Sequence, residues 1–161
     1  MVNPQRLASS FALNVRIMKL QTAGLSHAHS LLQLPFRGNS MNWVVGHLLA
    51  SRKRLISLLG GTLSIDAESL SRYATGSDPI TRDGADILQL DRLIEAVDES
   101  QQVLEDLLIG LKAAELERVI GKGDQAETLG ESIFGLYFHE TYHTGQLEIL
   151  RQLAGMDDAV I

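Results

Sequence analysis

The sequence contains no cysteine, so the chain cannot form disulfide bonds, thiolate metal ligands or a cysteine nucleophile of its own. Any thiol chemistry must therefore use a sulfur atom from another molecule. Proline is scarce, with three residues at positions 4, 35 and 79, and the segments between them are free to be helical. The uncharged stretch over residues 38–51 is 14 residues long and carries several polar side chains, so it is too short and too polar to span a membrane.

Basic residues are outnumbered by acidic ones. The chain has 14 Lys and Arg against 20 Asp and Glu, which gives a net charge of −6. This charge opposes binding to nucleic acids and to anionic membrane surfaces. The basic run Arg52-Lys53-Arg54 has no interleaved aromatic residues, and we interpret it as a solvated helix face. The N-terminal residues lack the apolar core of a signal peptide, so we expect a cytoplasmic protein.

Composition and apolar spacing predict an all-α protein. The length of 161 residues, 45% of them hydrophobic, predicts a single domain over residues 1–161. Apolar side chains recur at intervals of three and four in four segments, without the alternation typical of strands. The four segments are residues 4–34, 41–59, 83–110 and 129–154. Residues 61–83, rich in Gly, Ser, Thr and Asp, predict a long connection with one short helical turn. The sequence therefore predicts a four-helix bundle with one long crossover connection.

Local signals mark where these helices begin and end. Ser40 is a favourable N-cap for the second helix, and Gly60-Gly61 is a strong stop at its other end. Thr128 and Glu131 have the spacing of a capping box at the start of the last helix. We expect the third helix to begin near Asp83.

The last helix has polar residues in the middle of its apolar stripe. The stripe passes through Leu136 and Leu147, but Glu140 and His143 lie between them. A buried carboxylate or imidazole is costly unless it is paired, hydrogen-bonded or bound to a metal. His139 lies one turn before His143, which puts the two rings on the same face roughly 6 Å apart. The pair is therefore a candidate for holding one metal ion.

His47 is the candidate for a third metal ligand. It lies beside the apolar line of the second helix, and the adjacent Gly46 permits another segment to approach closely. If the second and last helices are neighbours, His47, His139 and His143 meet with one coordination position open, as in a catalytic zinc site. Considered alone, a histidine beside an apolar line is more often an ordinary hydrogen-bonded core or boundary residue than a metal ligand.

The segment His139-Glu140-Thr141-Tyr142-His143 matches the HExxH pattern of zinc proteases, in which the glutamate is a base. A zinc protease takes its third ligand downstream, but no histidine follows His143. An HExxH-type metal hydrolase is therefore the second interpretation of this site. Glu140 itself has two interpretations. It orients a metal ligand or accepts a proton, or it pairs with an arginine such as Arg52 or Arg54.

Two blocks of the sequence resemble the DinB/YfiT-like family, also called the DinB superfamily. The first block runs from Asn39 to Leu48 and the second covers residues 138–147, with further likeness in residues 73–79. The resemblance extends over nearly the whole chain. It implies an up-down-down-up four-helix bundle, often a homodimer, in which His47, His139 and His143 hold a divalent metal. Imidazole suits zinc, nickel, copper and iron, and we expect zinc or nickel.

The resemblance also implies a reaction on small molecules, because relatives include metal-dependent transferases and isomerases that use low-molecular-weight thiols. We therefore predict a metal-dependent enzyme that activates such a thiol, or water, for transfer or hydrolysis of a small-molecule substrate. Glu140 and Gln146 are the candidate catalytic residues that orient ligands or substrate, and Asn42 and Trp43 are candidates for lining the pocket. The alternative from another class is a non-enzymatic bundle that holds a metal for stability or sensing.

Overall fold

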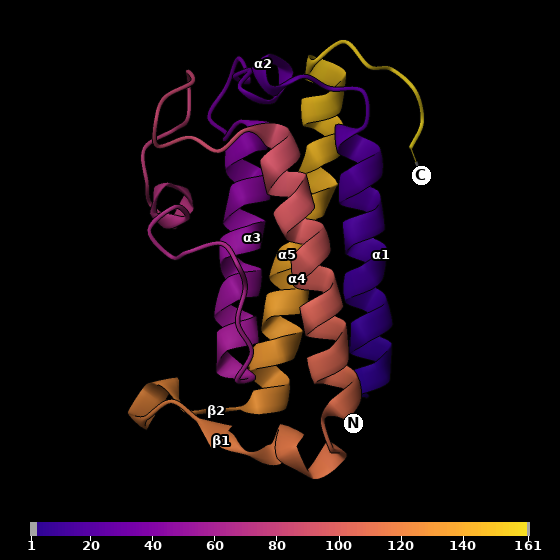
Figure 1. Cartoon of the computed structure of the whole chain (residues 1–161), viewed down its shortest axis with the longest axis vertical. Coiled ribbons are helices and arrows are strands. Elements are labelled where there is room, and N and C mark those ends of the chain that lie inside the picture. The colour runs from indigo at the N-terminus through magenta and orange to yellow at the C-terminus, as the bar shows by residue number, and fades with distance from the viewer. Residues whose placement is uncertain (1–2, 161) are drawn as a thin grey trace.

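Four long helices packed side by side form the body of the protein (Figure 1). The computed structural model describes residues 3–160. The long helices are α1 (Pro4–Thr22), α3 (Met41–Leu58), α4 (Leu90–Gly110) and α5 (Leu129–Leu153). Both α1 and α3 pack against α4 and α5, so α1 and α3 lie at opposite corners of the bundle. The all-α four-helix bundle predicted from the sequence is confirmed.

The long helices run up, down, down and up in chain order. Figure 1 shows α1 and α5 rising toward the end of the bundle that carries the C-terminus, whereas α3 and α4 descend from it. Because α3 and α4 are parallel, the chain between them has to return along the length of the bundle. This crossover, residues 59–89, contains one short 3-10 turn, η1 (Ser71–Tyr73), which packs against α3.

Side-chain caps fix the starts of three helices where the sequence predicts them. Asn3 caps α1 by accepting a hydrogen bond from the N–H of Arg6 at 3.0 Å. Ser40 caps α3 in the same way. At α5 the capping box is complete, because Thr128 accepts from the N–H of Glu131 and Glu131 accepts from the N–H of Thr128.

The first helix ends earlier than the sequence predicts. α1 stops at Thr22, although the apolar pattern continues toward Pro35. The reason lies at Gly24, whose φ of 77° is a left-handed conformation that ends a helix and that glycine adopts readily. The chain then makes one separate turn, α2 (His27–Ser30), before it enters α3.

The prediction that the third helix begins near Asp83 is wrong, because α4 begins at Leu90. Tertiary hydrogen bonds hold the preceding backbone outside a helix. The N–H of Leu88 donates to the Tyr73 hydroxyl at 2.8 Å, and the Leu88 carbonyl accepts from Asn42 Nδ2 at 2.9 Å. Local sequence contains no sign of these contacts, which join α3 to the crossover.

A small hairpin between α4 and α5 is a further feature that the sequence did not predict. It follows the 3-10 turn η2 (Ala113–Glu117) and consists of antiparallel strands β1 (Val119–Ile120) and β2 (Glu127–Thr128), joined through η3 (Gly123–Gln125). Each strand has two residues, which is too short to show alternation. β2 leads directly into α5 at one end of the bundle (Figure 1).

The space between the helices is filled by apolar side chains, among which Phe11, Met18, Leu48, Leu104 and Ile133 are almost fully buried. Burial of such residues provides the main driving force for folding. Within residues 3–160, none of the helices is both long enough and apolar enough to cross a membrane.

Candidate metal centre

Three histidines from two neighbouring helices converge beside the bundle core. His47 comes from α3, whereas His139 and His143 lie one turn apart on α5. Nε2 of His47 is 3.0 Å from Nε2 of His139, and the ring centroids of His139 and His143 are 4.6 Å apart. One ligand atom from each histidine lies within 4.8 Å of the other two. The adjacency of these helices, on which the three-histidine prediction depends, is therefore present.

The ring of His47 is fixed by its other nitrogen. Nδ1 lies 2.9 Å from the carbonyl oxygen of Tyr73, and a carbonyl only accepts, so Nδ1 carries the proton and donates. The lone pair of the neutral ring is then on Nε2, which faces His139. Trp43 stacks on a face of the ring, with centroids 4.6 Å apart and planes inclined by 13°. His47 is thus presented to the other histidines in the tautomer that binds a metal.

Tyr73 reaches His47 because residue 46 is glycine. A Cβ atom at Gly46 would lie 2.1 Å from Cδ1 of the Tyr73 ring, so the ring occupies the space that any side chain would need. The Tyr73 hydroxyl is held in turn by Asn42, whose Oδ1 accepts from it at 3.1 Å. The prediction that Gly46 permits close approach is confirmed. Asn42 is fully buried and anchors the crossover, so it does not line an open pocket as expected.

His143 has a matching partner on its own helix. Nδ1 of His143 lies 2.9 Å from Oε1 of Gln146, one turn further along α5. Since this oxygen accepts, Nδ1 donates and Nε2 keeps its lone pair. Gln146 therefore fixes the orientation of the His143 ring.

Burial and mutual repulsion favour the neutral form of His47 and His139. Burial is the largest cause of the fall in the pKa of His139 to about 4, and positive charge on the other two histidines and on Arg54 adds to it. Burial also lowers the pKa of His47, although the hydrogen bond with the Tyr73 carbonyl opposes the shift. Neutral imidazole is the form that coordinates metals, so this environment favours a cation between the rings over protons on them.

The donor set and spacing fit a divalent metal. In a tetrahedral site with metal–nitrogen distances of about 2.0–2.1 Å, neighbouring nitrogens are roughly 3.3 Å apart. The Nε2 atoms of His47 and His139 lie at 3.0 Å, close to this value. Three imidazoles also leave a coordination position for a further ligand. The three histidines could therefore hold a metal ion.

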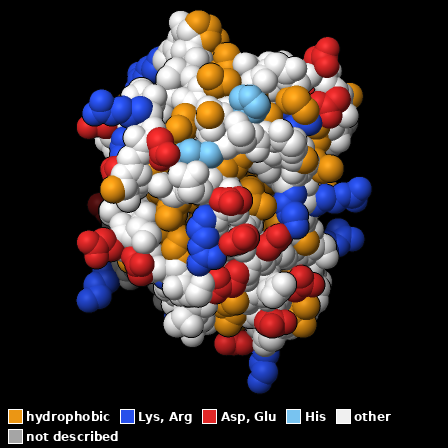
Figure 2. Space-filling model, turned by 45° about the horizontal axis from the view of Figure 1, so that its top comes forward, with side chains coloured by type: hydrophobic (Ala, Val, Ile, Leu, Met, Phe, Trp, Pro, Cys, Tyr) orange, Lys and Arg blue, Asp and Glu red, His pale blue; other side chains and the backbone are white. Residues whose placement is uncertain are grey.

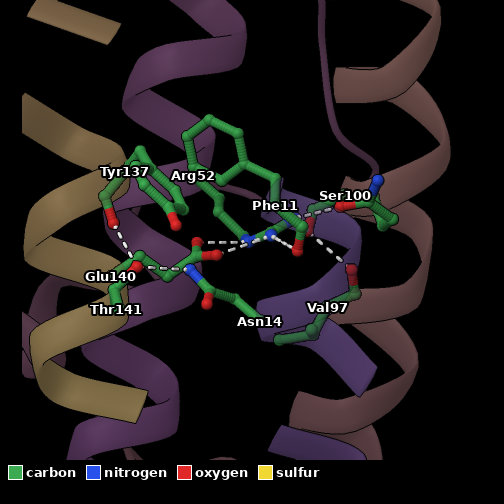
Figure 3. Close-up of polar contacts among 9 residues, drawn as sticks. Phe11, Asn14, Arg52, Val97, Ser100, Tyr137, Glu140 and Thr141 are labelled. Carbon is green, nitrogen blue, oxygen red and sulfur yellow. Dashed lines mark hydrogen bonds and ion pairs between the residues drawn. The ribbon is translucent and has the colours of Figure 1, made fainter. Parts of the chain in front are cut away.

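Glu140 does not face this site. Its carboxylate points into the bundle and forms a two-point ion pair with Arg52, with Nε to Oε2 at 2.6 Å and Nη2 to Oε1 at 2.8 Å (Figure 3). Residue 140 is about 100° around the helix from residue 139, which explains why the two side chains diverge. Of the two interpretations of Glu140, the structure shows the ion pair. The geometry supports neither a catalytic base at this position nor the HExxH arrangement of a zinc protease.

The interpretation of Arg52 as part of a solvated helix face is wrong, because Arg52 is 1% exposed. Besides Glu140 on α5, its guanidinium donates to Ser100 and Gln101 of α4 and to the Phe11 carbonyl of α1. One side chain of α3 thus bonds to the other three long helices (Figure 3). The sequence signal for this centre was Gln101, a polar residue within an apolar stripe.

A cleft of about 380 Å³ opens beside His47 and His139 and extends to the hairpin. It is bordered by His47 and Arg54 from α3, by His139 and Ser132 from α5, and by Glu127 from β2. The sequence offered no indication that the hairpin would contribute to this cleft. A molecule bound here would lie next to His47 and His139.

The fold and the site together define a class of protein: a four-helix bundle with a crossover and a cluster of three histidines. The sequence profile of the DinB superfamily matches residues 14–147, which include all three histidines. The chain therefore belongs to the DinB superfamily. It is similar to a crystal structure described as the conserved protein of a locus from Enterococcus faecalis, with a TM-score of 0.74 and 17% identity over 96% of this chain and 98% of that one. This likeness shows the shared fold. No protein with a curated function matches the chain significantly.

Proposed function

We propose that this protein is a metal-dependent enzyme in which His47, His139 and His143 hold one divalent ion, zinc or nickel, and that it acts on a small molecule by transfer or hydrolysis. The observation that carries the proposal is the convergence of three imidazoles, two of which, His47 and His139, line an open cleft and have Nε2 atoms 3.0 Å apart. Such an ion, when bound, lowers the pKa of a coordinated thiol or water and holds it beside an electrophile.

Residues around the cluster orient the histidines that would bind the metal. The Tyr73 carbonyl holds His47, and Gln146 holds His143, so the ligand nitrogens are directed before any ion arrives. The chain has no cysteine, so a nucleophilic sulfur would have to come from a low-molecular-weight thiol. The open cleft favours catalysis over a scaffold role, because a purely structural site has no need of access to solvent.

A small molecule suits this surface better than a nucleic acid does. The net charge is −6, and Figure 2 shows acidic side chains lying between the basic ones on the face it displays. Phosphate backbones bind to concentrated positive charge, which this face does not offer. We keep the expectation that neither nucleic acid nor a membrane is a partner.

We also propose that the protein is a homodimer that pairs through α5. Phe134, Phe138, Tyr142 and Ile149 are each more than half exposed and, with Gly145, form one uncharged stripe along this helix. Aromatic side chains bury about 150–250 Å² each, so the three rings leave roughly 300 Å² uncovered. A standard interface buries about 800 Å² per partner, and the stripe would form its apolar centre. Because the stripe carries no charge, a two-fold related copy can meet it despite the net charge.

Activity is tested with protein loaded with zinc or nickel, using 2-mercaptoethanol as thiol and chlorodinitrobenzene among a panel of electrophiles and esters. Thiol-dependent product that disappears in His47→Ala supports transfer. Product formed without thiol, with ¹⁸O from labelled water, supports hydrolysis. No turnover over the panel by protein with confirmed metal would contradict the enzymatic proposal and favour a non-enzymatic metal-holding bundle.

A further inference from the structure

The cleft beside the histidines contains one basic side chain among its lining residues, Arg54. His47, Ser51 and Arg54 follow each other at intervals of four and three on α3, so they lie in one line along the same helix face. Within the described residues, no carboxylate lies within ion-pairing distance of the Arg54 guanidinium, and no hydrogen bond engages it. The charge is nevertheless close enough to His139 to help lower the pKa of that residue.

Three hydroxyl groups that line the same cleft make no hydrogen bond to the described part of the protein. Ser132 is 7% exposed, yet its hydroxyl makes no hydrogen bond to any described residue. The Ser51 and Thr75 hydroxyls, which also line the cleft, are likewise unengaged in the part of the chain described. The Ser132 oxygen reaches solvent within the cleft, so its hydroxyl is accessible to a ligand that binds there.

The charge balance of the lining indicates the kind of ligand. Arg54 and Glu127 both line the cleft without forming an ion pair, so the walls carry one positive and one negative charge around neutral histidines. A guanidinium binds planar oxyanions through paired N–H donors. The acidic Glu127 would repel a doubly charged phosphate more strongly than a singly charged carboxylate. A volume of about 380 Å³ is at the small end of the range for ligand pockets.

We propose that this cleft binds the carboxylate of a small substrate, with Arg54 as its counter-ion and the hydroxyls of Ser51 and Ser132 as hydrogen-bond donors. The proposal rests on the proposed function, in that it places the substrate beside the histidine cluster. Arg54 is then a specificity-determining residue. It would hold the substrate by a group that does not react and leave the reacting group free to turn toward His47 and His139.

The test uses metal-free full-length protein, so that a failure of the metal proposal does not obscure the result. Butyrate and its neutral analogue butyramide are titrated while the amide signals of Ser51, Thr75 and Ser132 are followed by NMR. We expect saturable shifts with butyrate and none with butyramide. Arg54→Gln should weaken butyrate binding at least tenfold, Arg54→Lys should weaken it less, and Arg16→Gln, an exposed charge on α1, should leave it unchanged.

Three results would overturn the proposal. They are the absence of saturable shifts with butyrate, equal binding of butyrate by Arg54→Gln, and binding of inorganic phosphate as tight as that of butyrate. The same titration with His143→Ala separates this proposal from the metal site. If His143→Ala loses the metal but still binds butyrate, both proposals are supported. If wild-type protein binds a metal but does not bind butyrate, only the carboxylate subsite is contradicted.

Discussion

Arg52 and Glu140 form a buried two-point ion pair at the centre of the bundle, where they are 1% and 2% exposed. Glu140 directly follows His139 of the histidine cluster in sequence. Arg52 and Glu140 lie on the facing helices that also carry the three histidines. The pair therefore joins α3 to α5 one residue away from the site. We infer that it holds the helices at the separation that His47 and His139 require.

Replacing Glu140 by Gln should destabilise the protein by about 3–5 kcal/mol, because Arg52 would keep its buried charge without a counter-ion. Urea unfolding of the two proteins measures the difference. The matched control is Asp98→Asn, which breaks the exposed pair with Lys19 and should change stability by less than about 1 kcal/mol. Equal effects of the two substitutions would show that the buried pair has no special role.

Replacing Gly46 by Ala should displace Tyr73 and destabilise the protein by about 1–3 kcal/mol, because the new methyl group would overlap the ring. The Tyr73 carbonyl would move as well, so His47 should lose its hydrogen bond and metal affinity should fall. Thermal unfolding and a zinc titration check both effects. Gly110→Ala is the control, since nothing lies within 4 Å of a Cβ at Gly110. A Gly46→Ala protein as stable as that control would contradict the close packing.

Stability of the metal-free protein should fall as the pH drops below about 6.5. The pKa of His139 is about 4 in the folded chain and near 6.5 in an unfolded one. Between these values the unfolded state takes up a proton that the folded state does not, so unfolding becomes easier toward pH 4. The lowered pKa of His47 acts in the same direction. Urea unfolding at pH 7.5 and pH 5 measures the change, and His139→Asn should reduce it. A pH-independent free energy of unfolding would be the contrary result.

If the protein pairs as proposed, replacing Phe138 by Asp should give monomers, because it puts a charge into the proposed interface on α5. Light scattering coupled to gel filtration measures the mass. Ile109→Asp is the control, since Ile109 is 52% exposed on α4 and lies outside the α5 stripe. A wild-type protein that is monomeric at micromolar concentration would exclude this interface.

The parts of the fold that the sequence predicted are those that neighbouring residues determine. Ser40 and the Thr128 capping box set helix starts through bonds that span three residues. The start of α4 could not be predicted in this way, because the Leu88 backbone is held by Asn42 and Tyr73, which precede it by 46 and 15 residues. The hairpin was missed because strands of two residues have no period.

In the candidate site, too, the sequence predicts what nearby residues determine and misses what depends on distant ones. The sequence predicts His139 and His143 as ligands from their spacing of one helical turn, and His47 from its motif. The role of Glu140 depended on Arg52, 88 residues away, and both interpretations remained open until the helices were placed. Arg54 is exposed, as the sequence predicts for a solvated run, but its place opposite the hairpin residue Glu127 in one cleft exists only in three dimensions.

The metal content of the purified protein tests the three-histidine site most directly. Protein expressed without an affinity tag and purified without added metal is compared by elemental analysis with His47→Ala, His139→Ala and His143→Ala, each checked for helical content by circular dichroism. We expect about one zinc or nickel ion per wild-type chain and a loss of that ion in every variant. A wild-type protein that neither contains nor takes up a divalent ion, or a His47→Ala protein that retains it, would contradict the site.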